Sequence, residues 1–103
     1  MDGVAYLVKR MNQRDPIGQY IPSEEKREIF VSEGPLSRSE YFRAGQNRMN
    51  PEIMLTTSEI NYDGETVIEY KNVRYGIYRT FHKEDSDEIE MYLHRQAGIE
   101  RGG

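Results

Sequence analysis

The sequence predicts a mainly β protein, a small antiparallel β-barrel or sandwich of five to six strands with one short helix inserted between strands 2 and 3. Three observations support this class. Short apolar or alternating runs recur along the chain, turn-forming pairs separate several of them, and only one segment has the signals of a helix start. At 103 residues the chain is expected to be one domain over residues 1–103.

The first two strands are expected at residues 4–10 and 26–33, where apolar and β-branched side chains gather. Residues 11–24 lie between them and contain Pro22, which opposes regular pairing. We therefore predict a long, flexible loop over this stretch, which could serve as an interface. Its candidate interface residues are Asp15, Ile17, Gly18 and Tyr20.

The single helix is expected to start at Ser37, because Ser37 and Glu40 have the spacing of a capping box. In that motif the serine oxygen accepts the Glu40 backbone N–H, and the Glu40 carboxylate returns to the Ser37 N–H. Leu36 and Tyr41 are placed to form a hydrophobic staple. Gly45 can adopt the left-handed conformation that ends a helix after about two turns.

The remaining strands follow from alternation and turn chemistry, and are expected at residues 53–60, 65–70, 73–81 and 88–95. Lys71-Asn72 separates two of them at the two-residue spacing of a β-hairpin, and Asp63-Gly64 is a tight-turn signal. In the last strand, apolar residues alternate with polar ones, which indicates one buried and one wet face. Residues 96–103 are predicted to be a flexible C-terminal tail.

The composition limits the function classes. The apolar share is 36%, the charged share is 31% and the net charge is −4, so a modest core is expected to gain stability from partners or oligomerisation. An acidic chain lacks the basic stripe that grips nucleic-acid phosphates. No cysteine, membrane-spanning run or signal peptide is present in the sequence, which predicts a soluble protein made in the cytoplasm.

Motifs for catalysis or metal binding are missing from the sequence. His82 and His94 do not have metal-ligand spacing, and the acidic turn around Asp85 lacks the glycine and later glutamate of a calcium loop. Serine residues occur without a nucleophile elbow. We therefore expect a protein that is not an enzyme and has no cofactor and no metal.

The order of segments GPLSRSEYFRAG, MNPEIMLTT, YDGETVIEYKNVRYGIYR and IEMYLHRQAG resembles the head-completion proteins of tailed bacteriophages, also called head closure, stopper or head–tail joining proteins. The resemblance covers most of the chain. It departs from the family at Asn72, where a glycine is common, and at the generic N-terminal strand. The matching residues are Pro35, Leu36, Ser37, Glu40, Tyr41, Phe42, Ala44, Val67, Tyr70, Val73, Tyr75, Ile77, Ile89, Met91 and Leu93.

The resemblance implies a structural role. Family members form a homo-oligomeric ring, dodecameric in the assembled connector, below the portal or adaptor protein. The ring closes the DNA-filled head and presents a docking surface to a tail-completion or tail-terminator protein. Genomic DNA passes through the channel without sequence-specific binding, and no membrane is involved. The protein is then expected in the host cytoplasm during assembly and at the head–tail interface of the virion afterwards.

The resemblance also implies a gate, because the family's segment between the second and third strands can point toward the channel. Here this segment is residues 37–51. Gly45 is a hinge candidate, and Arg43 and Arg48 could meet DNA phosphates. Whether this segment or residues 11–24 close the channel stays open. The candidate gate residues are Ser37, Glu40, Tyr41, Arg43, Gly45, Asn47, Arg48, Asn50 and Pro51.

Two other classes remain open from sequence. One is a small β-barrel module that binds a peptide or single-stranded nucleic acid on a stacking surface of tyrosines. The other is a small enzyme subunit or inhibitor in which Glu40 or the cluster Asp85–Glu88 acts as acid or base. The tyrosines of the first alternative are Tyr70, Tyr75, Tyr78 and Tyr92.

Overall fold

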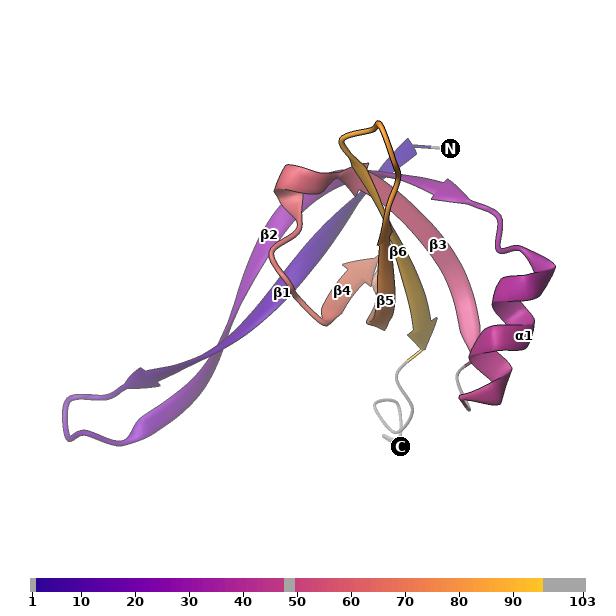
Figure 1. Cartoon of the computed structure of the whole chain (residues 1–103). Coiled ribbons are helices and arrows are strands. Elements are labelled where there is room, and N and C mark those ends of the chain that lie inside the picture. The colour runs from indigo at the N-terminus through magenta and orange to yellow at the C-terminus, as the bar shows by residue number, and fades with distance from the viewer. Residues whose placement is uncertain (1, 48–49, 96–103) are drawn as a thin grey trace.

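The computed structural model describes residues 2–47 and 50–95 and shows a mainly β fold (Figure 1). Six strands, one α-helix and one 3₁₀ turn follow each other along the chain. The elements are β1 (Asp2–Arg14), β2 (Tyr20–Gly34), α1 (Arg38–Gln46), β3 (Pro51–Ser58), η1 (Glu59–Asn61), β4 (Val67–Tyr70), β5 (Val73–His82) and β6 (Glu88–Arg95). The helix therefore lies between the second and third strands, as the sequence predicted.

All six strands belong to one antiparallel sheet that closes on itself in the order β1-β2-β3-β6-β5-β4. The ring closes where β1 pairs with β4 over Ala5–Val8. On the other side, β2 pairs with β3 only over Ser32–Gly34. The predicted fold class is confirmed. Because the β1–β4 and β2–β3 pairings are short, long parts of β1 and β2 lie outside the ring.

Alternate side chains of every strand point into the ring and form a single core. In β6, Met91 and Leu93 are fully buried, which confirms the predicted wet and dry faces of that strand. Tyr70 and Tyr75 also belong to the core. The fully buried side chains of largest volume are Tyr70, Leu7, Leu55, Ile68, Met91 and Leu93.

Local turn chemistry fixes the β4–β5 hairpin. Lys71 and Asn72 both have positive φ, at 53° and 64°, as a two-residue type I′ turn requires. Asn72 tolerates this conformation better than most residues other than glycine. Gly64, with φ at 83°, forms the turn that precedes β4. The bounds of β6 agree with the predicted strand over residues 88–95.

The predicted loop over residues 11–24 is wrong in the structure. β1 continues to Arg14 and β2 begins at Tyr20, so most of this stretch is paired strand. Only Asp15–Gln19 forms the turn, in which the Asp15 N–H donates to the Gln19 carbonyl at 2.8 Å. The hairpin runs well beyond the ring of strands, at the lower left of Figure 1. We call residues 9–25 the arm.

Pro22 can lie inside β2 because the backbone N–H that proline lacks would point away from β1 at this position. Bonded and non-bonded pairs alternate in an antiparallel ladder. Counting from the bonded pair Asp15–Gln19, the pair Asn12–Pro22 falls on a position whose backbone groups point away from the partner strand. Proline is tolerated there since no ladder bond within the hairpin is lost.

Other predicted boundaries shift by a few residues. Strands β1 and β2 are longer than expected at both ends. Strand β3 starts at Pro51 and ends at Ser58, directly before the 3₁₀ turn. Strand β4 begins at Val67, two residues after the predicted start. The predicted tail over residues 96–103 lies outside the described residues.

Candidate functional site

The candidate gate helix α1 starts as the sequence predicted. Ser37 is the N-cap, and its Oγ accepts the backbone N–H of Glu40 at 3.1 Å. The second half of the expected capping box does not form, because the Glu40 carboxylate turns toward the sheet instead. Tyr41, the expected staple partner of Leu36, is 52% exposed.

The carboxylate of Glu40 holds the helix on the outer surface of β5. Glu40 is only 4% exposed. Its Oε2 accepts the Tyr78 hydroxyl at 2.6 Å and the Arg79 Nε at 3.2 Å, while the other oxygen pairs with the Arg79 guanidinium. Hydrogen bonds from Arg79 are the main cause that lowers the pKa of Glu40 below its usual value. The helix is thus fastened by an ionised carboxylate, and we call Glu40, Tyr78, Arg79 and Tyr92 the latch.

A β-bulge in β5 makes the latch possible. Ile77 pairs with Leu93 and Arg79 with Tyr92, which leaves Tyr78 without a partner in β6. An extra residue in a strand re-aims the side chains beside it. The consecutive residues Tyr78 and Arg79 can therefore both reach the same carboxylate, although strict alternation would send them to opposite faces.

Aromatic rings cover the Arg79 side of the latch. The Arg79 guanidinium carbon lies 4.1 Å from the centroid of the Tyr92 ring, within the range of a cation–π contact. Burial, followed by the hydrogen bond to Glu90, raises the pKa of Tyr92 to about 12. Burial is also the main cause that raises the pKa of Tyr78, with the Glu40 hydrogen bond second. Both hydroxyls therefore stay neutral donors at physiological pH.

The exposed side chains of α1 include basic and aromatic ones. Phe42 is 71% exposed, and Arg38 and Arg43 are also exposed. Neither arginine has a salt-bridge partner within residues 2–47 and 50–95. A hollow of about 380 Å³ lies between the helix and β5 and is lined by Glu40, Arg43, Ala44, Asn47, Tyr78 and Arg79.

The end of the helix differs from the prediction. Gly45 lies within α1 and does not adopt a positive φ, so it does not end the helix. Asn47 is the C-cap, and its N–H donates to the Ala44 carbonyl at 3.0 Å. Asn50 precedes Pro51, which opens β3 opposite His94. Arg48 lies outside the described residues.

The candidate interface residues of the arm meet at its tip. Asp15 organises the turn, because its Oδ1 accepts the Ile17 N–H at 3.1 Å and the Gln19 N–H at 2.8 Å. Gly18 supplies a positive φ of 92°. Ile17 and Tyr20 are exposed by 78% and 65%, respectively. The prediction of a flexible loop was wrong, yet its four named residues lie together at an exposed end of the molecule.

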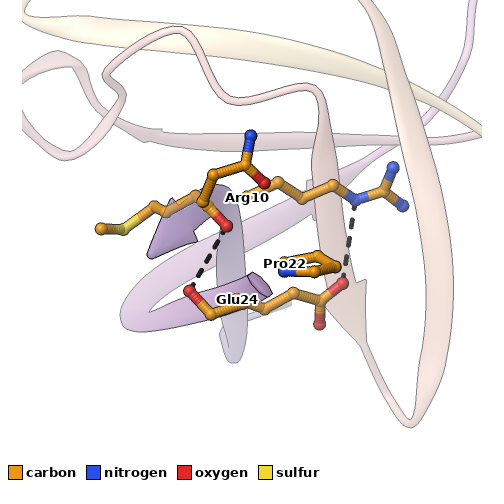
Figure 2. A pocket seen from close by; sticks show the side chains of 6 residues that line it. Arg10, Pro22 and Glu24 are labelled. Atoms are coloured by element: carbon orange, nitrogen blue, oxygen red, sulfur yellow. Dashed lines mark hydrogen bonds and ion pairs between the residues drawn. The ribbon is translucent and has the colours of Figure 1, made fainter. Parts of the chain in front are cut away.

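Charged residues fix the base of the arm to the ring of strands. Arg74 of β5 donates to both oxygens of Glu24, at 3.0 and 3.1 Å, and also pairs with Glu69 of β4. Arg10 lies 3.8 Å from the same Glu24 carboxylate. Figure 2 shows Arg10 and Glu24 joined in this way above and below the ring of Pro22. A hollow of about 640 Å³ adjoins these side chains.

The alternative stacking surface does not form. Tyr70 and Tyr75 are exposed by only 2% and 5%, so a base or a peptide cannot reach their rings. Tyr78 and Tyr92 are engaged in the latch. Of the two histidines, His82 pairs with Glu59, and His94 contacts the Tyr78 ring edge to face at 5.8 Å.

Comparison with known proteins places no further constraint on the site: neither a family model nor a curated protein matches the chain. Across the described ranges, no helix is long and apolar enough to cross a membrane. No group of three His, Asp or Glu side chains suited to a metal ion occurs in that part of the chain.

Proposed function

We propose that this chain is a head–tail connector of a tailed bacteriophage, a ring subunit that closes the DNA-filled head and joins it to the tail. The observation that carries the proposal is the placement of α1. A short helix leaves a closed ring of strands between β2 and β3, at the position where the resembling proteins have their channel segment. The ring of strands gives a rigid scaffold, and connecting segments on such scaffolds commonly carry function.

The gate in this proposal is the segment 37–51, and the latch is what holds it back. One carboxylate on α1 meets Tyr78 and Arg79 on β5. A helix attached by a few polar contacts can leave the sheet without opening the apolar core, because its own buried residues are limited to Glu40 and Ala44. When α1 leaves, its arginines can approach DNA phosphates in the channel.

Partners and location belong to the same proposal. The ring contacts the portal or adaptor protein on one side and a tail-completion or tail-terminator protein on the other. DNA passes through without base recognition, in keeping with a net charge of −4. The protein works first in the host cytoplasm and then in the virion.

The test is to inactivate the gene in the source phage and to examine the particles by electron microscopy together with nuclease-protected DNA. We expect separate tails and heads that have packaged and then lost their DNA. Complementation with the wild-type chain should restore full particles. Normal particles in the absence of the gene would refute the proposed function.

A further inference from the structure

The arm has two free backbone edges, one on each strand. Strand β1 pairs with β4 over Ala5–Val8, and within residues 2–47 and 50–95 its outer edge has no partner strand from Lys9 to Arg14. Strand β2 pairs with β3 over Ser32–Gly34, and in the same part of the chain its outer edge has no partner strand over residues 20–31. A hairpin of two strands is marginally stable alone, and unpaired edges are templates for another strand. The edges of the arm can therefore pair with a strand of another chain.

The two edges carry complementary charges. The stretch KRMNQR over residues 9–14 contains three basic residues and no acidic one. The outer edge of β2 over residues 24–29, EEKREI, contains three acidic residues and two basic ones, and Glu24 and Glu28 are among its even-numbered positions. Apolar side chains are also exposed along the arm, with Met11 at 37%, Ile21 at 46% and Ile17 at 78%. The basic β1 edge and the acidic residues of the β2 edge complement each other between two copies of this chain.

We propose that the β1 edge of the arm pairs with the outer β2 edge of the neighbouring copy over residues 24–29, where the arm joins the ring of strands. In hairpins that stand side by side in the same orientation, β1 of one copy runs antiparallel to β2 of the next. Each copy offers one edge of each kind, so the contact is heterologous and repeats around a closed ring. Closure of the ring pairs the β1 edge of every arm, as in a barrel. This inference rests on the proposed ring function and names the surface that builds the ring.

The outward-facing backbone groups restrict the register. Bonded and non-bonded pairs alternate from the bonded pair Asp15–Gln19 at the tip. On β1, the outward backbone groups therefore belong to Arg10, Asn12 and Arg14. On β2 they belong to the even-numbered residues, in agreement with the Phe30 carbonyl, which accepts the Thr57 hydroxyl from outside the hairpin at 2.8 Å. Outward positions must face outward positions in the new pairing.

One register satisfies both the charges and Pro22. With Arg14 opposite Glu24 of the neighbouring copy, Arg10 lies opposite Glu28 and Asn12 opposite Lys26 of that copy. Pro22 then lies beyond the end of the facing strand, so its missing N–H breaks no bond. Opposite charges that face each other across strands stabilise a pairing. Glu28 has no salt-bridge partner among the described residues and would gain one.

The experiment uses one blocked edge in each of two full-length variants. Asn12→Pro removes an outward N–H of β1, and Lys26→Pro removes one of β2; Asn12→Ala and Lys26→Ala keep the N–H and are the matched controls. Sedimentation velocity should show wild-type oligomers and alanine-variant oligomers. Each proline variant alone should be monomeric, with unchanged circular dichroism. An equimolar mixture of the two proline variants should form a dimer, because one complementary pair of edges remains.

A charge exchange tests the same contact without proline. Arg10→Glu and Glu28→Arg should each weaken oligomerisation, and the double variant should restore it. Rescue must act between copies, because Tyr6 faces Glu28 and Glu24 faces Arg10 within one hairpin. Oligomers of the proline variants, a mixture that stays monomeric, a wild-type chain that is monomeric at every concentration, or absence of rescue would overturn the inference. Arm-dependent oligomers together with normal particles in the gene-inactivated phage would refute the proposed function alone.

Discussion

Removal of the Glu40 carboxylate is the sharpest test of the latch. Breaking a buried ion pair by removing one partner costs about 3–5 kcal/mol. The Arg79 side chain keeps 30% exposure, so the guanidinium that is left behind can be hydrated. We therefore expect Glu40→Ala to lower the free energy of unfolding by about 3 kcal/mol, at the low end of that range. Glu40→Gln keeps an acceptor oxygen and should cost about 2 kcal/mol.

The measurement is urea unfolding followed by circular dichroism, with hydrogen exchange of the α1 amides as a local readout. Glu84→Gln is the matched control, since Glu84 is exposed in the β5–β6 turn and should change stability by less than about 0.5 kcal/mol. Exchange in α1 should accelerate in the Glu40 variants, whereas exchange in the buried strand β4 should follow global unfolding. A Glu40→Ala variant with stability and α1 exchange equal to those of the control would refute the latch.

The pH dependence of the same variants checks the charge of Glu40. Because its pKa is lowered in the folded state, Glu40 contributes stability that is fully present above its ordinary pKa of 4.5. This contribution is lost as the pH falls through the lowered value. The difference in stability between wild type and Glu40→Gln should therefore shrink on acidification. A difference that stays constant into the acid range would show that the carboxylate acts through shape and not through charge.

Three further changes address single features. Ser37→Ala should lower stability by about 1 kcal/mol, the usual value of an N-cap, and unchanged helicity and urea midpoint would contradict the cap. Asn72→Gly should match or exceed wild-type stability, whereas Asn72→Ala should cost about 1–2 kcal/mol, because φ is 64° at this position; equal midpoints would contradict this reasoning. Deletion of residues 43–50 should leave the strands folded by circular dichroism but let DNA leak from filled heads, and wild-type retention would place the gate elsewhere.

The parts of the fold that sequence predicted well depend on neighbouring residues. The Ser37 cap involves an acceptor and a donor three positions apart. The hairpin turn at Lys71 and Asn72 depends on two consecutive residues, and the wet and dry faces of β6 follow from strict alternation. In each case the physical cause is contained in a short window, so one sequence is sufficient to identify it.

The arm was not predicted because Pro22 was expected to oppose strand pairing along the whole stretch. In the structure the turn occupies only the tip, at residues 15–19. Whether Pro22 disrupts a strand depends on the direction in which its N–H would point, and that direction follows from the register and not from the residue type. A register counted from the tip would have identified the long hairpin.

The latch could not be found from sequence for a different reason. Glu40 and Arg79 are 39 positions apart. Their contact also requires the β-bulge at Tyr78, which no local sequence pattern predicts. The spacing of Ser37 and Glu40 favoured a carboxylate that closes its own helix cap. In the folded chain, the guanidinium and phenol donors of β5 compete for that carboxylate more strongly than one backbone N–H, because a charge-assisted fork gives shorter and stronger bonds.

The way in which each element is attached favours 37–51 over 11–24 as the moving segment. The arm is continuous with two strands of the ring, and Arg74 ties its base to Glu24 and Glu69. Moving it would break both a β-ladder and this network. Helix α1 is joined to the sheet by the Glu40 contacts and a small buried face, so its release leaves the ladder intact. In the proposed connector, an arm that stays in place builds the ring, and a helix that can be released closes the channel.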